Sequence, residues 1–436
     1  MNNPNRRMII LAGWALALSA SCAVAQDWPQ WRGPNRDAKA AEFKAPPTWP
    51  KELTQKWKVA VGEGVATPAL LGDKLYVFSR QEGNEILRCL DAVTGKELWQ
   101  DKYESMGASG PAASFSGPRS SPTVADGKVV TLGVRGMISC LEAATGKKLW
   151  RKDEFKAFPR FHPSSSPIVV NGLCIAQLGG SDNGALVAYD LATGDEKWKW
   201  TGDSPGYASP VLMSVGDTKL IIGETERRIV AVNAADGKLA WETPYVVQGR
   251  GYNASTPIVD GQTLIFAGSG RGTRAVKIEK TGDGFAGNEL WNNAEKSVQF
   301  NSPVLKTGLV YGLTQGNELY CLSAKDGKTA WSAPVSKGGE APPAGGGAGQ
   351  GGPGGRGPGR GMGGGGGGYG SIVDAGSVLL ALTPGSELIV FQPGDKAYTE
   401  LARIKVAASQ THAYPIVSGN RIFIKDKDAV TLWTIQ

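Results

Sequence analysis

Leu90-Asp91-Ala92-Val93-Thr94-Gly95-Lys96-Glu97-Leu98-Trp99 is the stretch of this sequence that predicts the fold. An acidic residue is followed by Thr-Gly, and a tryptophan comes four residues after the glycine. Glycine supplies the positive φ that a tight hairpin needs, and the acidic side chain accepts hydrogen bonds from turn amides. The stretch therefore indicates a hairpin whose second strand carries the tryptophan. Close variants of the pattern return at Leu141–Trp150, Tyr189–Trp198, Val232–Trp241 and Leu322–Trp331.

Tryptophan and proline together mark a repeating unit, and a repeat of this length indicates stacked supersecondary units. Seven tryptophans, spaced 40 to 51 residues apart, form one series: Trp57, Trp99, Trp150, Trp198, Trp241, Trp291 and Trp331. Seven prolines, six of them after Ser or Thr, form a second series that opens each unit: Thr67-Pro68, Ser121-Pro122, Ser166-Pro167, Ser209-Pro210, Thr256-Pro257, Ser302-Pro303 and Tyr414-Pro415.

Each unit reads as four short strands separated by glycine-containing turns, with proline at the start of the first strand, where no ladder donor is needed. A single four-stranded sheet cannot cover both of its faces, but copies arranged around an axis can. We therefore predict an all-β, eight-bladed β-propeller of antiparallel blades in which the tryptophans dock between neighbours. The unit that begins at Ser371 has Ala402 in the tryptophan position.

The two ends of the repeat region complement each other. The last unit, from Tyr414, has only three strands, and Leu53–Val61, with Trp57, is a fourth strand without a unit. We expect these segments to share one blade, because ring closure removes the exposed sheet edges of an open array.

Outside the repeats, residues 1–25 have the basic start, apolar core and Ala-Val-Ala cleavage site of a signal peptide. Ser19-Ala20-Ser21 is a poor lipoprotein site, so lipid anchoring at Cys22 is not expected and the location is periplasmic or secreted. Residues 26–52 are rich in Trp and Pro and are expected to be extended, to pack on the propeller as a plug or to dock a partner. The propeller covers 53–436, interrupted by a flexible glycine-rich insertion at 338–370.

Composition and cysteines exclude several classes of protein. The 436 residues are 41% hydrophobic with a formal charge of +7, which excludes a collagen-like, wholly disordered or polytopic membrane protein. Apart from the signal segment, no apolar stretch approaches membrane-spanning length, and export argues against a nucleic-acid partner. Four cysteines fall in the repeats, and we expect free, buried thiols rather than disulfides or metal ligands: Cys89, Cys140, Cys174 and Cys321.

The repeated Asp-x-x-Thr-Gly turn with its tryptophan resembles the pyrroloquinoline-quinone (PQQ)-like repeat family, within the quinoprotein alcohol dehydrogenase-like superfamily. The resemblance covers roughly residues 53–436 and implies a propeller. It also implies one of two functions: a PQQ-dependent alcohol or sugar dehydrogenase with calcium, or a cofactor-free scaffold such as the BamB-type outer-membrane assembly proteins. The adjacent cysteines and long insertions of many dehydrogenases in the family are missing here.

Residues just before the opening prolines should line one rim of the central funnel. They could bind only water, as in any propeller, or form a mildly basic pocket for an anionic small molecule, a glycan or a peptide. Arg119 and Arg250 would be the carboxylate partners of a bound quinone. The candidate ligand-binding residues are Arg119, His162, Tyr207, Arg250, Tyr252, Asn253, Asn301 and His412, with Ser164, Gln299 and Gln410 beside them.

These observations favour a monomeric, exported, non-enzymatic scaffold or binding module of the cell envelope, with no catalytic or metal residues and no cofactor. Its partner would be an envelope protein or a small ligand. The alternatives are a PQQ- and calcium-dependent oxidoreductase with a reduced site, and a carbohydrate-binding propeller. Fold membership alone does not choose among them.

Overall fold

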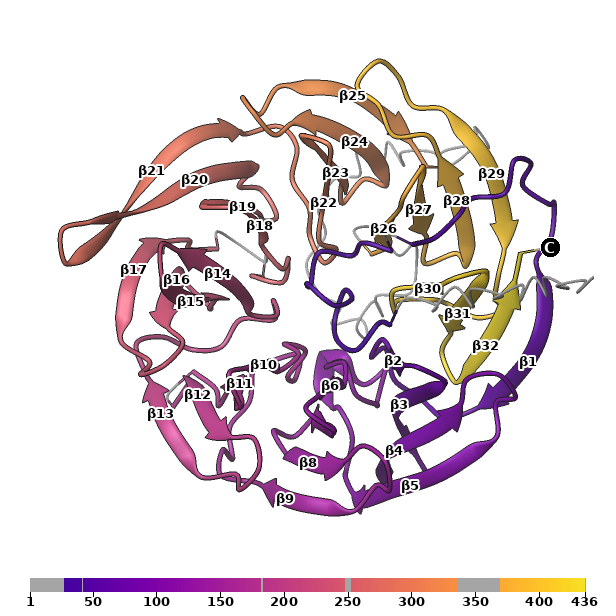
Figure 1. Cartoon of the computed structure of the whole chain (residues 1–436), viewed down its shortest axis with the longest axis horizontal. Helices are drawn as coiled ribbons and strands as arrows, with labels where there is room; N and C mark the ends of the chain where they lie inside the picture. Colours follow the sequence, from indigo (N-terminus) through magenta and orange to yellow (C-terminus); the bar gives the residue numbers. More distant parts are fainter. Residues whose placement is uncertain (1–26, 41, 182, 248–251, 336–368, 436) are drawn as a thin grey trace, which may run out of the picture.

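The computed structural model describes residues 27–40, 42–181, 183–247, 252–335 and 369–435. In this part of the chain, 32 strands form eight four-stranded antiparallel sheets arranged in a ring around a central channel (Figure 1). One short 3-10 helix, η1 (Gly110–Ala112), precedes the second sheet. The predicted eight-bladed, all-β propeller is confirmed.

Blades are numbered here along the chain. Blades 1 to 4 are β2–β5 (Ala69–Leu71, Lys74–Gln81, Asn84–Asp91, Glu97–Glu104), β6–β9 (Thr123–Ala125, Lys128–Leu132, Ile138–Glu142, Lys148–Lys152), β10–β13 (Ile168–Val170, Leu173–Leu178, Ala185–Asp190, Glu196–Trp200) and β14–β17 (Val211–Val215, Thr218–Glu224, Arg228–Asn233, Leu239–Pro244).

Blades 5 to 7 are β18–β21 (Ile258–Asp260, Thr263–Ala267, Thr273–Thr281, Gly284–Asn293), β22–β25 (Val304–Lys306, Leu309–Leu313, Glu318–Ser323, Thr329–Pro334) and β26–β29 (Ser371–Ala375, Val378–Leu382, Glu387–Phe391, Glu400–Lys405). Blade 8 combines β30–β32 (Ile416–Ser418, Arg421–Lys425, Ala429–Thr434) with β1 (Thr54–Ala60). Thr54 pairs with Thr434, so the two ends of the repeat region share one sheet as predicted.

The tryptophans dock between blades through one repeated contact. Trp198 of blade 3 donates its Nε1–H to the carbonyl of Ala234 in blade 4, at 3.1 Å. Gly237 has φ +71°, and a Cβ there would lie 2.5 Å from the Trp198 ring, so the turn glycine is required both for the turn and for the indole. The same bond recurs from Trp57 to Ala92, Trp150 to Leu191, Trp291 to Ala324 and Trp331 to Gly394.

Blade 7 has Ala402 at the tryptophan position because its neighbour, blade 8, is formed by both ends of the repeat region. The docked tryptophans other than Trp241 contact the turn between the third and fourth strands of the next blade, and Trp241 contacts Gly287 on the fourth strand, β21. In blade 8 the third strand, β32, comes from the end of the chain and the fourth, β1, from its start, so no such turn exists there. Instead, Phe43 and Trp49, which precede β1, join the hydrophobic cluster that contains Ala402.

The Ser or Thr before each opening proline ties neighbouring blades together. The backbone N–H of Ser121 donates to the hydroxyl of Ser166, at 2.9 Å, and that of Ser166 donates to Ser209 at the same distance. We call this set the hydroxyl ring. Its other bonds run from Thr67 to Ser121, Ser209 to Thr256, Thr256 to Ser302 and Tyr414 to Thr67. The motif thus joins seven of the eight blades around the channel.

Residues 27–40, which we call the plug, close the channel from one side. The propeller has two faces. The turn face carries the turns that join strands 1 and 2 and strands 3 and 4 of each blade. The rim face carries the loops between strands 2 and 3 and the connections from one blade to the next. Asp27 accepts from Gly72 in a turn-face turn, and Ala40 donates to the carbonyl of Asp374 near another. The segment is not extended throughout, because Arg32, Arg36 and Ala38 have positive φ and the chain turns between them.

The plug contacts every blade. Figure 1 shows the indigo chain at the centre of the ring, from where it crosses β26–β29 outward to β1. Its contacts, from blade 1 to blade 8, are Trp28 with Leu70, Pro29 with Val124, Arg36 with Ser166, Pro167 and Pro210, Trp31 with Thr256, Arg32 with Pro303, Ala40 with Asp374, and Trp31 with the Tyr414 ring.

Several expectations fall outside the described residues. The signal peptide at 1–25, with Cys22, lies there, as do Arg250 and all but the last two residues of the insertion at 338–370. In the parts of the chain that the structure covers, no helix has the length and apolarity needed to cross a membrane.

The four repeat cysteines are free and buried, as predicted. Cys89, Cys140 and Cys321 stand directly opposite the tryptophans of their blades. Burial raises the pKa of the Cys89 thiol to about 11 and that of Cys140 to about 12.

Because the thiolate is the reactive form, we expect none of the four thiols to react with Ellman's reagent in the native protein. All four should react in 6 M guanidinium chloride, and Cys22→Ser would keep the count to these four. Fast labelling of any of them under native conditions would contradict the packing described here.

Candidate functional site

Three of the predicted rim residues, Tyr207, Tyr252 and His412, lie in two aromatic groups. In the first, the Phe161 ring lies 6.2 Å from Tyr207 and 4.7 Å from Tyr252, measured between ring centroids. In the second, the His412 ring lies 4.8 Å from Phe115 and from Tyr369, in edge-to-face geometry. Both groups lie on the rim face, because each precedes the first strand of a blade.

Arg119 is committed to its own loop. Nη2 donates to the carbonyls of Ala112 and Phe115, at 2.9 and 2.8 Å, and Nη1 donates to Gly117, at 3.2 Å. Burial lowers the pKa of Arg119 to about 10, with the Tyr369 and Tyr207 hydroxyls acting in the opposite direction. The guanidinium therefore holds the segment around η1 in place rather than presenting a free fork to a ligand.

His162 is fully buried, and protein atoms engage both ring nitrogens. Nδ1 lies 2.8 Å from the carbonyl of Val134, and Nε2 accepts from the backbone N–H of Ser109, at 2.9 Å. A neutral ring with the proton on Nδ1 satisfies both contacts. Burial lowers the pKa of His162, which favours that neutral form.

Asn253 and Asn301 are also buried and bind backbone carbonyls. The Asn253 amide donates to Thr225, Glu226 and Tyr245, and so fixes the loop between β15 and β16. Asn301 donates to the carbonyl of Leu313, at 2.7 Å. Both side chains join a blade to the connection that precedes the next one.

His412 differs from these residues, because neither ring nitrogen has a hydrogen-bond partner among the described residues. Burial between Phe115 and Tyr369 lowers its pKa to about 4. Its neutral ring packs against the Phe115 and Tyr369 rings.

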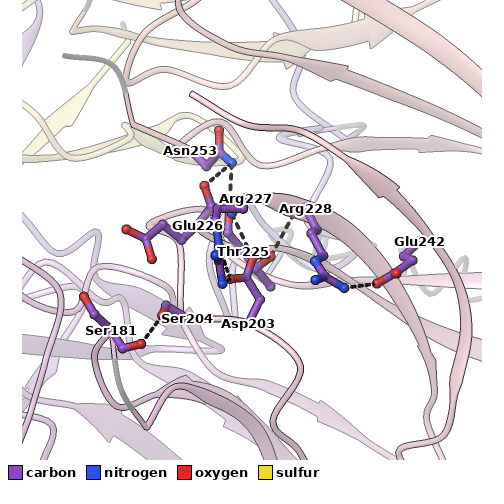
Figure 2. Close-up of polar contacts among 9 residues, drawn as sticks. All are labelled: Ser181, Asp203, Ser204, Thr225, Glu226, Arg227, Arg228, Glu242 and Asn253. Atoms are coloured by element: carbon purple, nitrogen blue, oxygen red, sulfur yellow. Dashed lines mark hydrogen bonds and ion pairs between the residues drawn. The ribbon is translucent and has the colours of Figure 1, made fainter. Parts of the chain in front are cut away.

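A polar network that the sequence did not reveal lies between blades 3 and 4 (Figure 2). Asp203 accepts from the Thr225 hydroxyl, at 2.7 Å, and from the backbone N–H and Nε of Arg227, at 2.8 and 3.0 Å. Burial raises the pKa of Asp203, but these hydrogen bonds outweigh burial, so the net shift is downward. The network holds the β15–β16 loop with Glu226 and Arg227 exposed on the rim face.

A cavity of about 380 Å³ adjoins this network. Asp203, Arg227 and Lys199 line it, and Phe155 contributes an apolar surface. The remaining lining residues are Ser181, Asn183, Gly184, Thr201, Gly202 and Ser204. The cavity thus combines two cations, one buried carboxylate and one aromatic ring.

Glu224 lies beneath the same loop, fully buried, and neither carboxylate oxygen has a hydrogen-bond partner among the described residues. The equivalent position in blade 3 is Gln177, which donates to Ala208 and accepts from Gly206. Burial raises the pKa of Glu224 well above its ordinary value. A protonated carboxyl has the donor and acceptor of an amide, so the neutral form suits this position.

We expect Glu224→Gln to raise the free energy of unfolding by about 1–3 kcal/mol at pH 8, the usual penalty of an unpaired buried polar group. Because the folded pKa is raised, the wild type loses stability as pH rises above about 4.3, the pKa in the unfolded chain. The gain should therefore shrink towards pH 4. Urea titrations across this range measure it, with the exposed Glu226→Gln as control. A gain independent of pH would contradict a buried, titrating Glu224.

The residues present do not fit the quinone and calcium that the repeat family admits. Arg119 is bound to three carbonyls, and Arg250 lies outside the described residues. Among the residues that the structure covers, no three His, Cys, Asp or Glu side chains gather into a cation-binding group. Within the described part of the rim, Arg119 is therefore not free to bind a quinone carboxylate.

The fold and its docking repeats define a class, the PQQ-like eight-bladed propellers. Residues 83–333, more than half of the chain, match the family described as outer membrane protein assembly factor BamB. The chain belongs to that family.

The chain is similar to two curated relatives and to one solved structure. It is 24% identical over 299 residues to BamB of Yersinia pestis, covering 64% of this chain and 70% of that one. It is 27% identical over 200 residues to BamB of Burkholderia pseudomallei, covering 44% of this chain and less than half, 46%, of that relative. The crystal structure of quinohemoprotein alcohol dehydrogenase from Comamonas testosteroni matches with a TM-score of 0.67 and 14% identity over 95% of this chain and 81% of that one, which shows the fold alone.

Proposed function

We propose that this protein is a non-enzymatic scaffold of the cell envelope that binds a partner protein through its rim face. The observation that carries the proposal is how the polar groups of that face are used. The side chains of Arg119, His162 and Asn253 form hydrogen bonds with backbone groups. Asp203, in contrast, holds the loop in which Glu226 and Arg227 are exposed. A rigid loop with charged tips is suited to recognition and does not supply a reaction centre.

The family relationship supports this proposal, because the matching family model and a relative that aligns with 64% of this chain are both described as outer membrane protein assembly factor BamB. A periplasmic location, reached by cleavage after Ala25, is part of the proposal. So is a monomeric propeller that works without a cofactor. An envelope protein, rather than a nucleic acid, is the proposed partner.

Site-specific photo-crosslinking tests the proposed surface. A photoreactive amino acid at Glu226 should give one defined adduct with an envelope protein in intact cells. The same amino acid at Val93, exposed in a turn on the opposite face, should give none. Asp203→Ala, which releases the loop, should reduce the Glu226 adduct. Equal adducts from both faces, or none from Glu226, would overturn the assignment.

Assays for the two alternatives complete the test. Purified protein given PQQ and calcium should show no dye-linked oxidation of alcohols or aldoses, and a glycan panel should show no selective binding. Quinone-dependent turnover would replace the scaffold by an oxidoreductase. Selective glycan binding that Tyr207→Ala abolishes would replace it by a carbohydrate-binding propeller.

A further inference from the structure

Arg32 of the plug carries an incomplete set of hydrogen bonds in the middle of the protein. Its side chain is fully buried, and Nη2 donates to the carbonyl of Pro303, at 2.5 Å. Nε and Nη1 have no partner among the described residues. A guanidinium only donates hydrogen bonds, so the atoms that would complete this site are acceptors.

The positive charge of the plug also favours a bound group that accepts hydrogen bonds. Arg36, four residues further on, is also buried, and its Nη1 and Nη2 bind the carbonyls of Ser166, Pro167 and Pro210. Neither arginine forms an ion pair within the described residues. Burial lowers the pKa of Arg36 to about 9, as expected for a cation without a nearby carboxylate. Two buried positive charges without a counter-charge are costly in a protein interior.

Besides Arg32 Nε and Nη1, a third nitrogen of the plug lacks a hydrogen-bond partner among the described residues. The Trp28 ring is fully buried, and its Nε1–H has no partner in the described chain. Indole nitrogen is also a donor only. The unsatisfied side-chain groups of the plug are therefore all donors, which suits a negative ion and does not suit a cation.

We propose that the channel beside Arg32 binds a small inorganic anion, chloride, that accepts hydrogen bonds from the free N–H groups of Arg32. The complete burial of Arg32 favours a small, monatomic ion, and the centroid of the Tyr414 ring lies 5.9 Å from the guanidinium carbon. The anion neutralises part of the plug's charge and so holds residues 27–40 in the channel.

Bromide substitution tests the position of the ion directly. Crystals of the wild-type protein grown in sodium bromide should show an anomalous scattering peak within hydrogen-bonding distance of Arg32 Nε or Nη1. A water molecule in that place, or no peak there, would overturn the proposal. This measurement needs no variant and is independent of any effect on folding.

Thermal unfolding tests the energetic role. At equal ionic strength, sodium chloride should raise the melting temperature of the wild type by about 2–4 °C over sodium gluconate, because binding to the folded state stabilises it. Arg32→Met keeps the side-chain length without the charge and should lose this difference. Arg160→Met, at an exposed arginine, should keep it. Equal melting temperatures in the two salts, or a chloride response retained by Arg32→Met, would refute the site.

Discussion

Trp198→Ala is expected to lower the free energy of unfolding by about 3–5 kcal/mol, the range for removing a large buried aromatic side chain. The indole fills the seam between blades 3 and 4, contacts Gly237 and donates to Ala234. The substitution leaves a cavity and an unpaired buried carbonyl, and both destabilise the seam. Urea denaturation followed by circular dichroism measures the change.

The neighbouring Trp200 supplies a matched control on the same strand. Its ring is only half-buried, and Trp200→Ala should cost less than half as much. Similar losses for the two variants would mean that docking between blades contributes little beyond ordinary burial, and would contradict the repeated contact as the stabilising unit of the ring.

Arg36→Ala is expected to lower the free energy of unfolding by about 2–4 kcal/mol. Charge-assisted hydrogen bonds contribute about 1.5–3 kcal/mol each, and Arg36 makes three to carbonyls of blades 3 and 4. Relief of the buried charge offsets part of that loss, so the net effect is smaller than the sum.

Limited proteolysis should show that the same variant releases the plug, with faster cleavage within residues 27–40 than in the wild type. Lys44→Ala, at an exposed position just beyond the plug, is the control and should leave both stability and cleavage nearly unchanged. A stable Arg36→Ala variant with a protected plug would show that the other plug contacts suffice to hold residues 27–40 in the channel.

The fold could be predicted from sequence because its determinants are local and repeat. Gly95 and Trp99 lie four residues apart, and their equivalents recur often enough to count blades and to identify the shared one. Even the exception at Ala402 was visible, although its cause, the absence of a turn in blade 8, needed the assembled ring.

The site could be predicted only in part, because its contacts join residues that are distant in sequence. The polar pattern before the opening prolines predicts Arg119 and His162 as rim residues, but no local pattern indicates that their nitrogens bind backbone groups. Asp203 and Arg227 meet across two blades, so no local motif marks them. Glu224 ends an apolar strand, where only alignment with Gln177 reveals its unusual position.

The shared blade also determines when folding can finish. Thr54 and Thr434 are paired although nearly the whole propeller separates them in sequence. Contacts of such long range form slowly, because the intervening chain must be ordered first. A nascent chain therefore cannot complete its ring until β32 is available, and a product that ends before β32 leaves β1 without a neighbouring strand.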